Sequence, residues 1–504
     1  MTYVLFPGRH HLLTRFQETY LRGLAEADGT TIVWAVTSAN HENTRRNPVP
    51  FHRREAAIER FSLLAGLRSL VVPIFDAAPT ERFAEVTLKN IDVYAGLHLS
   101  PDDTIVACST PAVSALYERL GFDIAWVEAD PAHRPEPERP WDVLLRLASG
   151  DPTWQELAHP ATIDVYARYQ LADLVRTVVN DPVVGDEGGL TATRDYRTYI
   201  DAFADGAARK WQLVRPHVRP GRIVDIGCGA GAVLEQADRD DTLHESDLIG
   251  VEVARHLYEE CRHKKAQGAY RNPNVFFYHR NVLGGAVLQP RSIDTTMTFS
   301  LTHEIWSYGN RRESLLAFAR AIYEHTVPGG VWINSDVCGP TGKDRPVVLR
   351  LSTDDGDNPA KPRPDLASLS SAEVAAYVRG LSTRARFDQY AVDFAFEVAY
   401  EAAADPRDVQ LSLGAAMDFL TRKDYTDNWL SETREQFCGL EFADWIALLA
   451  EAGFEIDAAS APSRNDWIVA NRIAPVASLR TPDGEAVDWP ETHLLFIARR
   501  PRNS

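Results

Sequence analysis

The sequence predicts an α/β protein with two doubly wound domains, the second of which carries a helical cap insertion. Two observations lead to this prediction. Short apolar runs alternate with helical stretches through the first 125 residues and again from residue 222, the pattern of βαβ units with parallel strands. Between the two series, residues 180–193 lack apolar periodicity. We therefore expect domains at 1–180 and 195–504, joined by a linker at 181–194.

The first domain is predicted to be a parallel sheet with helical connections. Its strands are the apolar runs 3–6, 31–36, 69–75 and 104–107. Helical periodicity predicts helices at 16–25 and 53–61, and helical patterns resume from 141 to about 179. The Pro-rich polar run 131–140 predicts an exposed loop.

The second domain is predicted to begin with a helix at 196–215, followed by a second series of strands. These strands are expected at 222–226, 248–252, 275–278, 295–299 and 330–334. From about 341 to 440 the chain is polar and then helical without a strong strand, so we expect a lid or substrate-binding cap there. Three further strands are expected at 455–457, 467–470 and 492–497.

Composition and charge limit the classes of function. Lys and Arg number 53 against 71 Asp and Glu, a net charge of -18 that does not favour broad nucleic-acid binding. The five cysteines form no CxxC pair, which indicates reduced thiols. No apolar run reaches the ~18 residues of a membrane span, and no leader-like segment opens the chain. We expect a cytoplasmic enzyme that acts on small molecules or nucleotides and has no membrane partner. The sequence does not decide whether the chain forms a homo-oligomer.

A glycine-rich turn follows the strand at 222–226. The sequence VDIGCGAGAVLEQA places Asp225 before Gly227, Gly229 and Gly231, after which a helix is expected. Glycines let the backbone approach a ligand closely, and N–H groups at a helix start face polar ligands. Glu252 ends the next strand, and Asn281 and Val282 follow the third. The string also fits G-x-G-x-x-A, so a dinucleotide-dependent dehydrogenase is the alternative, although no Lys/Tyr or Cys/His arrangement supports it.

This arrangement resembles the class I S-adenosylmethionine-dependent methyltransferases over roughly residues 195–500. The resemblance implies a Rossmann-like domain with S-adenosylmethionine as cofactor. It places Asp225 near the methionine end of the cofactor and Glu252 on both ribose hydroxyls. It also implies that Asn281 meets the adenine, with Val282 as a neighbour. The glycines of the turn, Gly227, Gly229 and Gly231, complete the implied cofactor site.

His303 and Glu304 follow the fourth strand of this domain, where chemistry sits in doubly wound sheets. We predict that they align or deprotonate the methyl acceptor. The alternative is that His303 caps a helix and Glu304 makes a surface pair. Polar and aromatic residues further on are predicted to line an acceptor pocket, with packing between cap and core as the alternative: Tyr425, Asn428, Trp429, Arg464 and Asn465. No metal site is predicted.

In the first domain, the stretch FPGRHHLLT joins a strand to a helix. His11 and Thr14 then lie at a helix N-terminus, which suits phosphate, although both residue types are also common caps. In the order of its segments, the first 180 residues resemble the HxGH-type nucleotidyltransferases, above all the archaeal-style nicotinamide-mononucleotide adenylyltransferases. Thr14 replaces the second motif histidine, and the dipeptide 141–142 replaces a Ser/Thr.

That resemblance implies a nucleotide site for ATP with Mg²⁺, with His11 and Thr14 as catalytic residues. The implied nucleotide-binding residues are Gly8, Arg9, His11, Thr14, Ser109 and Arg146. Together the two halves predict a bifunctional enzyme, transferring methyl and nucleotidyl (adenylyl) groups to a phosphorylated or nucleotide-linked metabolite. Two alternatives remain: a methyltransferase with a degenerate nucleotide-binding domain, and a non-catalytic sensor of nucleotide and S-adenosylmethionine. An RNA-modifying enzyme is disfavoured by the net charge.

Overall fold

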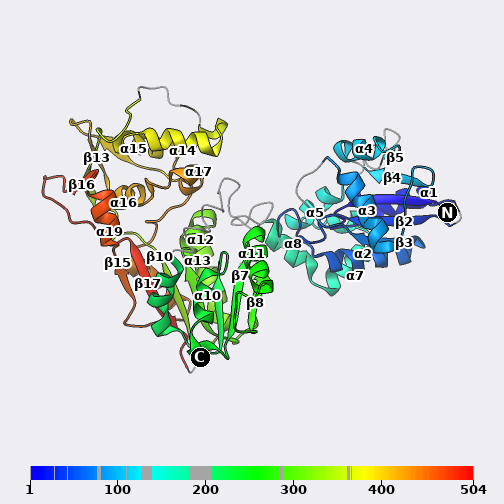
Figure 1. The fold of residues 1–504 in the computed structure, drawn as a ribbon, viewed down its shortest axis with the longest axis horizontal. Helices are drawn as coiled ribbons and strands as arrows, with labels where there is room; N and C mark the ends of the chain where they lie inside the picture. Colours follow the sequence, from blue (N-terminus) through cyan, green and yellow to red (C-terminus); the bar gives the residue numbers. More distant parts are fainter. Residues whose placement is uncertain are drawn as a thin grey trace. The chain divides into compact units, whose positions relative to one another are not determined.

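The computed structural model describes residues 2–27, 29–42, 44–76, 81–108, 110–126, 139–180, 206–282, 288–359, 364 and 366–502. The chain divides into two compact units, Met1–Gly188 and Gly189–Ser504. Figure 1 shows both units. The predicted linker 181–194 lies outside the described residues. In the described part of the chain, no helix is both long and apolar enough to cross a lipid bilayer.

The N-terminal unit contains a five-stranded parallel sheet. Its strands lie in the order β3 (Arg68–Pro73), β2 (Thr31–Val36), β1 (Tyr3–Gly8), β4 (Thr104–Cys108) and β5 (Asp123–Trp126). The last of these strands was not predicted. Successive residues of β1 and β2 face opposite sides, so that Val4 and Trp34 join one buried cluster while Leu5 and Val33 join another.

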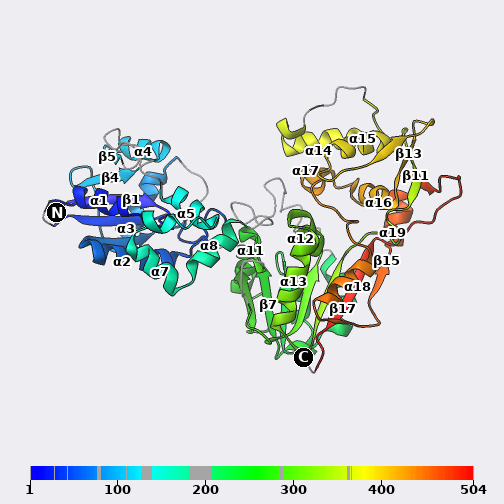
Figure 2. The same ribbon diagram turned by 180° about the vertical axis from the view of Figure 1, so that it is seen from behind.

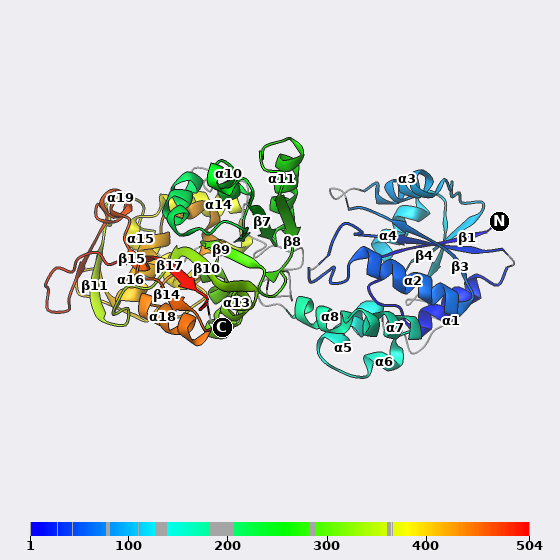
Figure 3. The same ribbon diagram turned by 90° about the horizontal axis from the view of Figure 1, so that it is seen from below.

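Helices cover both faces of this sheet (Figure 3). One face is covered by α3 (Phe83–Ala95) and α4 (Pro111–Glu118). The other face is covered by α1 (Arg15–Leu24), α2 (Phe51–Ala65), α5 (Pro140–Ala148), α6 (Trp154–Leu157), α7 (Pro160–Arg168) and α8 (Leu171–Val179). Two apolar cores therefore hold the sheet, one on each side.

The C-terminal unit is built on a second sheet whose central strands are parallel. Its order is β14 (Glu455–Ile456), β17 (His493–Arg499), β10 (Thr326–Val337), β9 (Ile293–Phe299), β6 (Arg222–Ile226), β7 (Asp247–Glu252) and β8 (Val275–His279), with β15 (Ala461–Ser463) also paired to β17. With β15 left out and the other seven strands numbered along the sequence, the order read from β8 is 3-2-1-4-5-7-6, and the last of these strands in the sequence, β17, runs antiparallel to β10. The order reverses between β6 and β9, where doubly wound sheets open a ligand crevice at their carboxyl edge.

Helices connect and cover these strands. They are the helical segment 206–214, α10 (Ala232–Asp238), α11 (Arg255–Ala266), α12 (Thr302–Tyr308), α13 (Arg312–His325) and α18 (Phe442–Glu451). The predicted strands at 222–226, 248–252, 275–278, 295–299 and 330–334 are confirmed, and all of these runs except 275–278 are largely buried.

The cap contains helices, as predicted, but it also contains a sheet that we did not predict. It contains a four-stranded antiparallel sheet in the order β12 (Tyr400–Ala402), β13 (Asp408–Ser412), β11 (Pro346–Leu351) and β16 (Ala477–Arg480). The helices α14 (Ser371–Gly380), α15 (Thr383–Asp393), α16 (Leu413–Arg422) and α17 (Trp429–Glu432) complete it. Figure 2 shows these cap helices at the end of the unit away from the C-terminus.

The predicted strand at 467–470 is also wrong. These residues form α19 (Asp466–Ile468) and a π-helical turn, Val469–Ile473. The side chain of Asn465 accepts a hydrogen bond from the backbone N–H of Ile468 at 3.2 Å and so caps the helix start. This local cap favours a helix over the strand preference of the β-branched pair 468–469.

Candidate cofactor and acceptor site

The glycine turn lies at the carboxyl end of β6 and is joined to the neighbouring strand. Gly227 and Gly229 have φ angles of 72° and 55°, a region that glycine adopts without the steric penalty of a Cβ. The N–H of Gly227 donates to the carbonyl of Val251 on β7 at 2.8 Å. A Cβ on Gly229 would meet no other atom within 4 Å, so its backbone borders open space.

The side chain of Glu252, at the end of β7, accepts hydrogen bonds from this turn and from the two residues that follow Glu252 in the chain. Its Oε2 accepts from the N–H of Gly229 at 2.8 Å, and its Oε1 accepts from those of Val253 at 2.8 Å and Ala254 at 2.7 Å. Burial raises the pKa of Glu252 to about 7. The three N–H groups lower this pKa, and the charge of Glu304 raises it further. Each carboxylate oxygen has two lone pairs, so the side chain retains acceptor capacity for a ligand.

Asp225 lies beside this turn, at the carboxyl end of β6. Its side chain is 1% exposed, and among the described residues no group hydrogen-bonds to its Oδ1. Burial raises its pKa to about 8, although the ammonium group of Lys210 lowers it. Burial in turn lowers the pKa of Lys210 to about 8. A buried acceptor without a donor is costly, which indicates that a ligand supplies the donor.

The predicted adenine contacts follow β8 at the same edge of the sheet. In the β7–β8 pair, Glu252 lies opposite His279, and Asn281 and Val282 come directly after that strand. Both residues are half-buried, and Val282 packs against the core of the unit. The structure thus brings the predicted cofactor residues to one edge, in the order that the resemblance implied.

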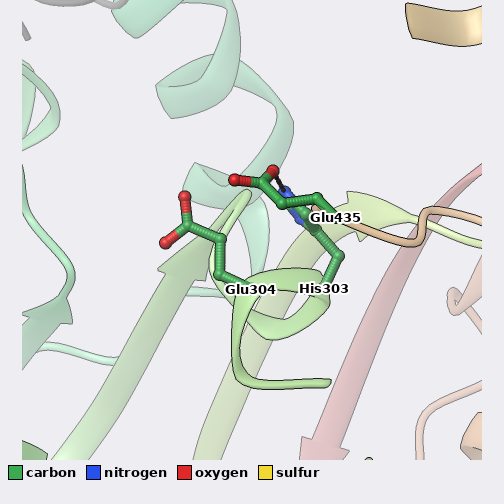
Figure 4. A group of neighbouring side chains, drawn as sticks. All are labelled: His303, Glu304 and Glu435. Carbon is green, nitrogen blue, oxygen red and sulfur yellow. Dashed lines mark ion pairs between the residues drawn. The ribbon is translucent and has the colours of Figure 1, made fainter. Parts of the chain in front are cut away.

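His303, on α12 after β9, lies between two buried carboxylates. Its Nδ1 is 2.6 Å from Oδ1 of Asp336, which lies on β10, and its Nε2 is 3.2 Å from Oε2 of Glu435 in the cap. Glu304 lies beside them, and Figure 4 shows His303 and Glu304 rising from α12 toward Glu435. These contacts show that neither side chain makes the surface cap or surface pair that we kept as the alternative.

Charge in this group favours a protonated His303. Burial alone would lower the pKa of His303, but the charges and hydrogen bonds of Asp336 and Glu435 raise it well above its usual value. Burial works the opposite way on Asp336, whose pKa is nevertheless lowered by His303 and by hydrogen bonds from Thr302 and the backbone of Val337. In the site as described, His303 therefore donates hydrogen bonds on both sides. We had predicted that His303 aligns or deprotonates the acceptor; a protonated His303 suits alignment, as a hydrogen-bond donor, and not uptake of a proton.

The cap supplies Glu435 through a set of polar contacts with α12. The indole N–H of Trp306 donates to Gln436 Oε1 at 2.9 Å, and the Gln436 N–H donates to Ser307 Oγ at 2.8 Å. The hydroxyl of Tyr308 donates to Glu435 Oε1 at 3.1 Å. Sequence reasoning missed Glu435, because no motif relates a cap residue to α12. It also missed Asp336, although an acid at the carboxyl end of an apolar strand was a usable signal.

The predicted pocket residues of the cap have mainly local roles. Trp429 is buried in the cap core and its indole N–H donates to Asp393 at 2.7 Å, so the packing alternative describes it. Arg464 binds Asp466 at 2.7 Å, and Asn465 caps α19. Tyr425 is exposed, and Asn428 lies half-buried at the start of α17.

In the N-terminal unit, two of the predicted nucleotide-site side chains are engaged locally. Thr14 forms a capping box with Gln17 at the start of α1, and Arg146 donates to Thr153 Oγ1 at 2.9 Å. Ser109 lies outside the described residues. Gly8 ends β1, and Arg9 follows it half-buried.

His11 differs from these residues. It is buried, and neither ring nitrogen has a hydrogen-bond partner in the part of the chain that the structure describes. Arg54, which we did not predict, lies buried nearby and donates to the carbonyls of Arg9, Thr37 and Ser38. Burial, with the charges of Arg54 and Arg9, lowers the pKa of His11 well below its usual value, although the neighbouring Asn47 side chain and Arg46 backbone raise it.

Comparison with known proteins gives low similarities. No protein-family model matches the sequence, and a search of curated proteins finds no match. Among solved structures, the chain is similar to an S-adenosylmethionine-dependent methyltransferase from Mesorhizobium loti (16% identity, TM-score 0.32), covering 59% of this chain and 100% of that one. It is also similar to a methyltransferase from Methanosarcina mazei, with 12% identity and a TM-score of 0.29, over 57% of this chain and 97% of that one. Geranyl diphosphate C-methyltransferase from Streptomyces coelicolor A3(2) is 11% identical with a TM-score of 0.32, over 60% of this chain and 83% of that one.

Proposed function

We propose that the C-terminal unit binds S-adenosylmethionine and transfers its methyl group to a small-molecule or nucleotide-linked acceptor. One observation carries this proposal. The buried, unpartnered Oδ1 of Asp225 and the carboxylate of Glu252 flank a glycine turn at the point where the strand order of a 3-2-1-4-5-7-6 sheet reverses. A ligand that suits this edge brings hydrogen-bond donors and positive charge.

S-adenosylmethionine fits these residues. Its ammonium group supplies the donor that Asp225 lacks, and its ribose hydroxyls can donate to Glu252. Asn281 and Val282, at the end of the neighbouring strand, would flank the adenine. The backbone of Gly229 borders open space, which leaves room for a ligand beside the turn. A positively charged cofactor would also favour the ionised form of both acidic groups, whose pKa values burial raises.

The residues around His303 are suited to holding the acceptor. When bound, the cofactor would supply a methyl group on a sulfonium: an acceptor lone pair would attack the methyl carbon in line, and the S–CH3 bond would break to leave a neutral thioether. Glu304 and Glu435 can accept hydrogen bonds from the acceptor, and His303 fixes Glu435 in place. A proton released by the acceptor can pass to one of these carboxylates, whereas protonated His303 is a hydrogen-bond donor.

Binding of S-adenosylmethionine to the full chain, measured by calorimetry, tests the proposal. We expect Glu252→Gln and Asp225→Asn each to weaken binding by about 10- to 100-fold, because each removes a charge-assisted hydrogen bond worth ~1.5–3 kcal/mol. Glu245→Gln is the matched control, since that side chain is 90% exposed. Unchanged affinity in both folded variants, or tighter binding of a nicotinamide dinucleotide, would overturn the proposal.

For the N-terminal unit we propose that it binds the phosphates of a nucleotide. This rests on buried His11, whose ring nitrogens have no hydrogen-bond partner among the described residues and which lies near the buried guanidinium of Arg54. Among the described residues its guanidinium donates to three carbonyls; burial and the charge of Arg9 lower its pKa to about 10, although the charges of Asp76 and Glu42 raise it. An anion would offset this charge. Nucleotidyl transfer to a phosphorylated metabolite is the stronger form of this proposal.

ATP binding and pyrophosphate release separate these two forms. We expect His11→Gln to weaken ATP binding to the full chain at least tenfold, while Arg60→Gln, at an exposed position of the same helix as Arg54, leaves it unchanged. Pyrophosphate release with a mononucleotide acceptor would support transfer. If the wild-type chain does not bind ATP, this second function is wrong, whatever the C-terminal unit does.

A further inference from the structure

The side chains around His303 form a group with the chemistry of a metal site. We propose that His303, Glu304 and Glu435 bind one divalent transition-metal ion, Mn²⁺ or Zn²⁺, and that Asp336 orients His303 for this task. Each of the three offers one ligand atom, and these atoms lie within 4.8 Å of one another. Ligand atoms bound to one ion at ~2.0–2.2 Å lie at most about 4.4 Å apart, so a shift of a few tenths of an ångström would let these three atoms meet a single ion.

The hydrogen bond between His303 and Asp336 orients the imidazole ring. Nδ1 of His303 lies 2.6 Å from Oδ1 of Asp336, which leaves Nε2 facing the two glutamates. Metal-binding histidines commonly donate their other ring N–H to a carboxylate in this way, which fixes both the tautomer and the ring orientation. Asp336 is itself held by the N–H and hydroxyl of Thr302, at 2.7 and 2.6 Å.

Burial and charge also favour a cation. Glu304 and Glu435 are 3% and 1% exposed, and Asp336 is buried as well, so three carboxylates surround one imidazole. A single proton on His303 balances only one of them. A divalent ion adds two charges at the point where the ligand atoms converge, and it would replace the proton between Nε2 and Glu435.

The donor set selects the kind of ion. Imidazole nitrogen suits zinc and the later transition metals, while carboxylate oxygen also suits manganese. Three protein ligands leave coordination positions open, as in catalytic rather than purely structural sites. Combined with the proposed methyl transfer, on which this role rests, the open positions would hold an oxygen of the acceptor.

Titration of the full chain with Mn²⁺ alone, followed by the electron paramagnetic resonance signal of the free ion, tests the site. We expect one ion per chain, and we expect Glu304→Gln and Glu435→Gln each to weaken binding at least tenfold. Asp336→Asn should weaken it by about 10- to 100-fold, as for other residues that orient a ligand. Asp427→Asn is the control, because that exposed acid pairs with Arg379 in the cap.

Circular dichroism and S-adenosylmethionine binding of each variant show whether it is folded. No saturable binding of Mn²⁺ or Zn²⁺ below about 1 mM would overturn the metal site, as would equal binding by wild type and the folded Glu304→Gln/Glu435→Gln double variant. Cofactor binding without metal binding would contradict only the metal site. Metal binding without cofactor binding would contradict only the proposed methyl transfer.

Discussion

Replacing Asp225 with asparagine should stabilise the ligand-free protein and weaken its binding of S-adenosylmethionine, the proposed cofactor. Asp225 is buried with one oxygen unpartnered, and its pKa is raised from an ordinary 3.8 to about 8. At pH 7 the unfolded carboxyl is ionised, whereas the folded one is mostly protonated. At ~1.4 kcal/mol per pKa unit, folding at pH 7 is then about 4 kcal/mol less favourable than with a neutral group at this position.

The sign follows from proton binding. Because the folded pKa lies above the unfolded one, the folded protein holds an extra proton between pH 3.8 and 8, and stability falls as pH rises through that window. The neutral amide in Asp225→Asn removes this dependence. We therefore expect the variant to gain up to about 4 kcal/mol over wild type at pH 7 and progressively less toward pH 4.

Urea unfolding of both proteins at pH 5, 6, 7 and 8 measures this difference. Saturating S-adenosylmethionine should reduce or reverse it, because the ligand stabilises the form that binds it better. A variant that is less stable than wild type at every pH, or a difference that does not change with pH, would refute the reasoning about an uncompensated carboxyl.

Three further predictions concern stability and the roles of single side chains. Burial lowers the pKa of His325 to about 4, so between pH 6.5 and 4 this side chain is neutral in the folded state and protonated in the unfolded state. The free energy of unfolding should therefore fall by up to about 3 kcal/mol as the pH drops through this range. Unfolding curves of His325→Gln should not show this loss. Arg422 is fully buried against Asp418 and donates to the carbonyl of Glu435, so Arg422→Met should destabilise the C-terminal unit by ~3–5 kcal/mol in chemical denaturation, and a smaller loss would contradict the buried pair. Thr14→Ala should cost about 1 kcal/mol as a lost N-cap and leave ATP affinity unchanged in calorimetry, whereas a large loss of affinity would restore its predicted catalytic role.

The elements that follow from local patterns were predictable. The apolar runs at 222–226 and 248–252 are buried on both faces of a parallel sheet, so their composition alone marks them as strands. The cap strands β11 and β13 alternate buried and less buried residues over only five or six positions, a weaker signal that we overlooked. The strand β16 joins them from beyond residue 440, where we had ended the cap.

The site was predictable only in part, for a similar reason. Asp225 and Glu252 are fixed by strand ends, which the sequence marks. Glu435 reaches His303 only through tertiary contacts across more than a hundred residues of chain, and no periodicity encodes such a pairing. The pairing of His303 with two carboxylates, rather than its mere position, decides its protonation, so its chemistry required the structure.

The most direct measurement of the central claim is a crystal structure of the full chain grown with S-adenosylhomocysteine, the demethylated cofactor. We predict that it lies at the carboxyl edge of β6 and β7, with its amino group on Asp225 and its ribose hydroxyls on Glu252. Its adenine should lie against Val282 and its sulfur should face the group of His303, Glu304 and Glu435. Density for the compound elsewhere, or none at this edge under saturating conditions, would contradict the assignment of this unit as a methyltransferase.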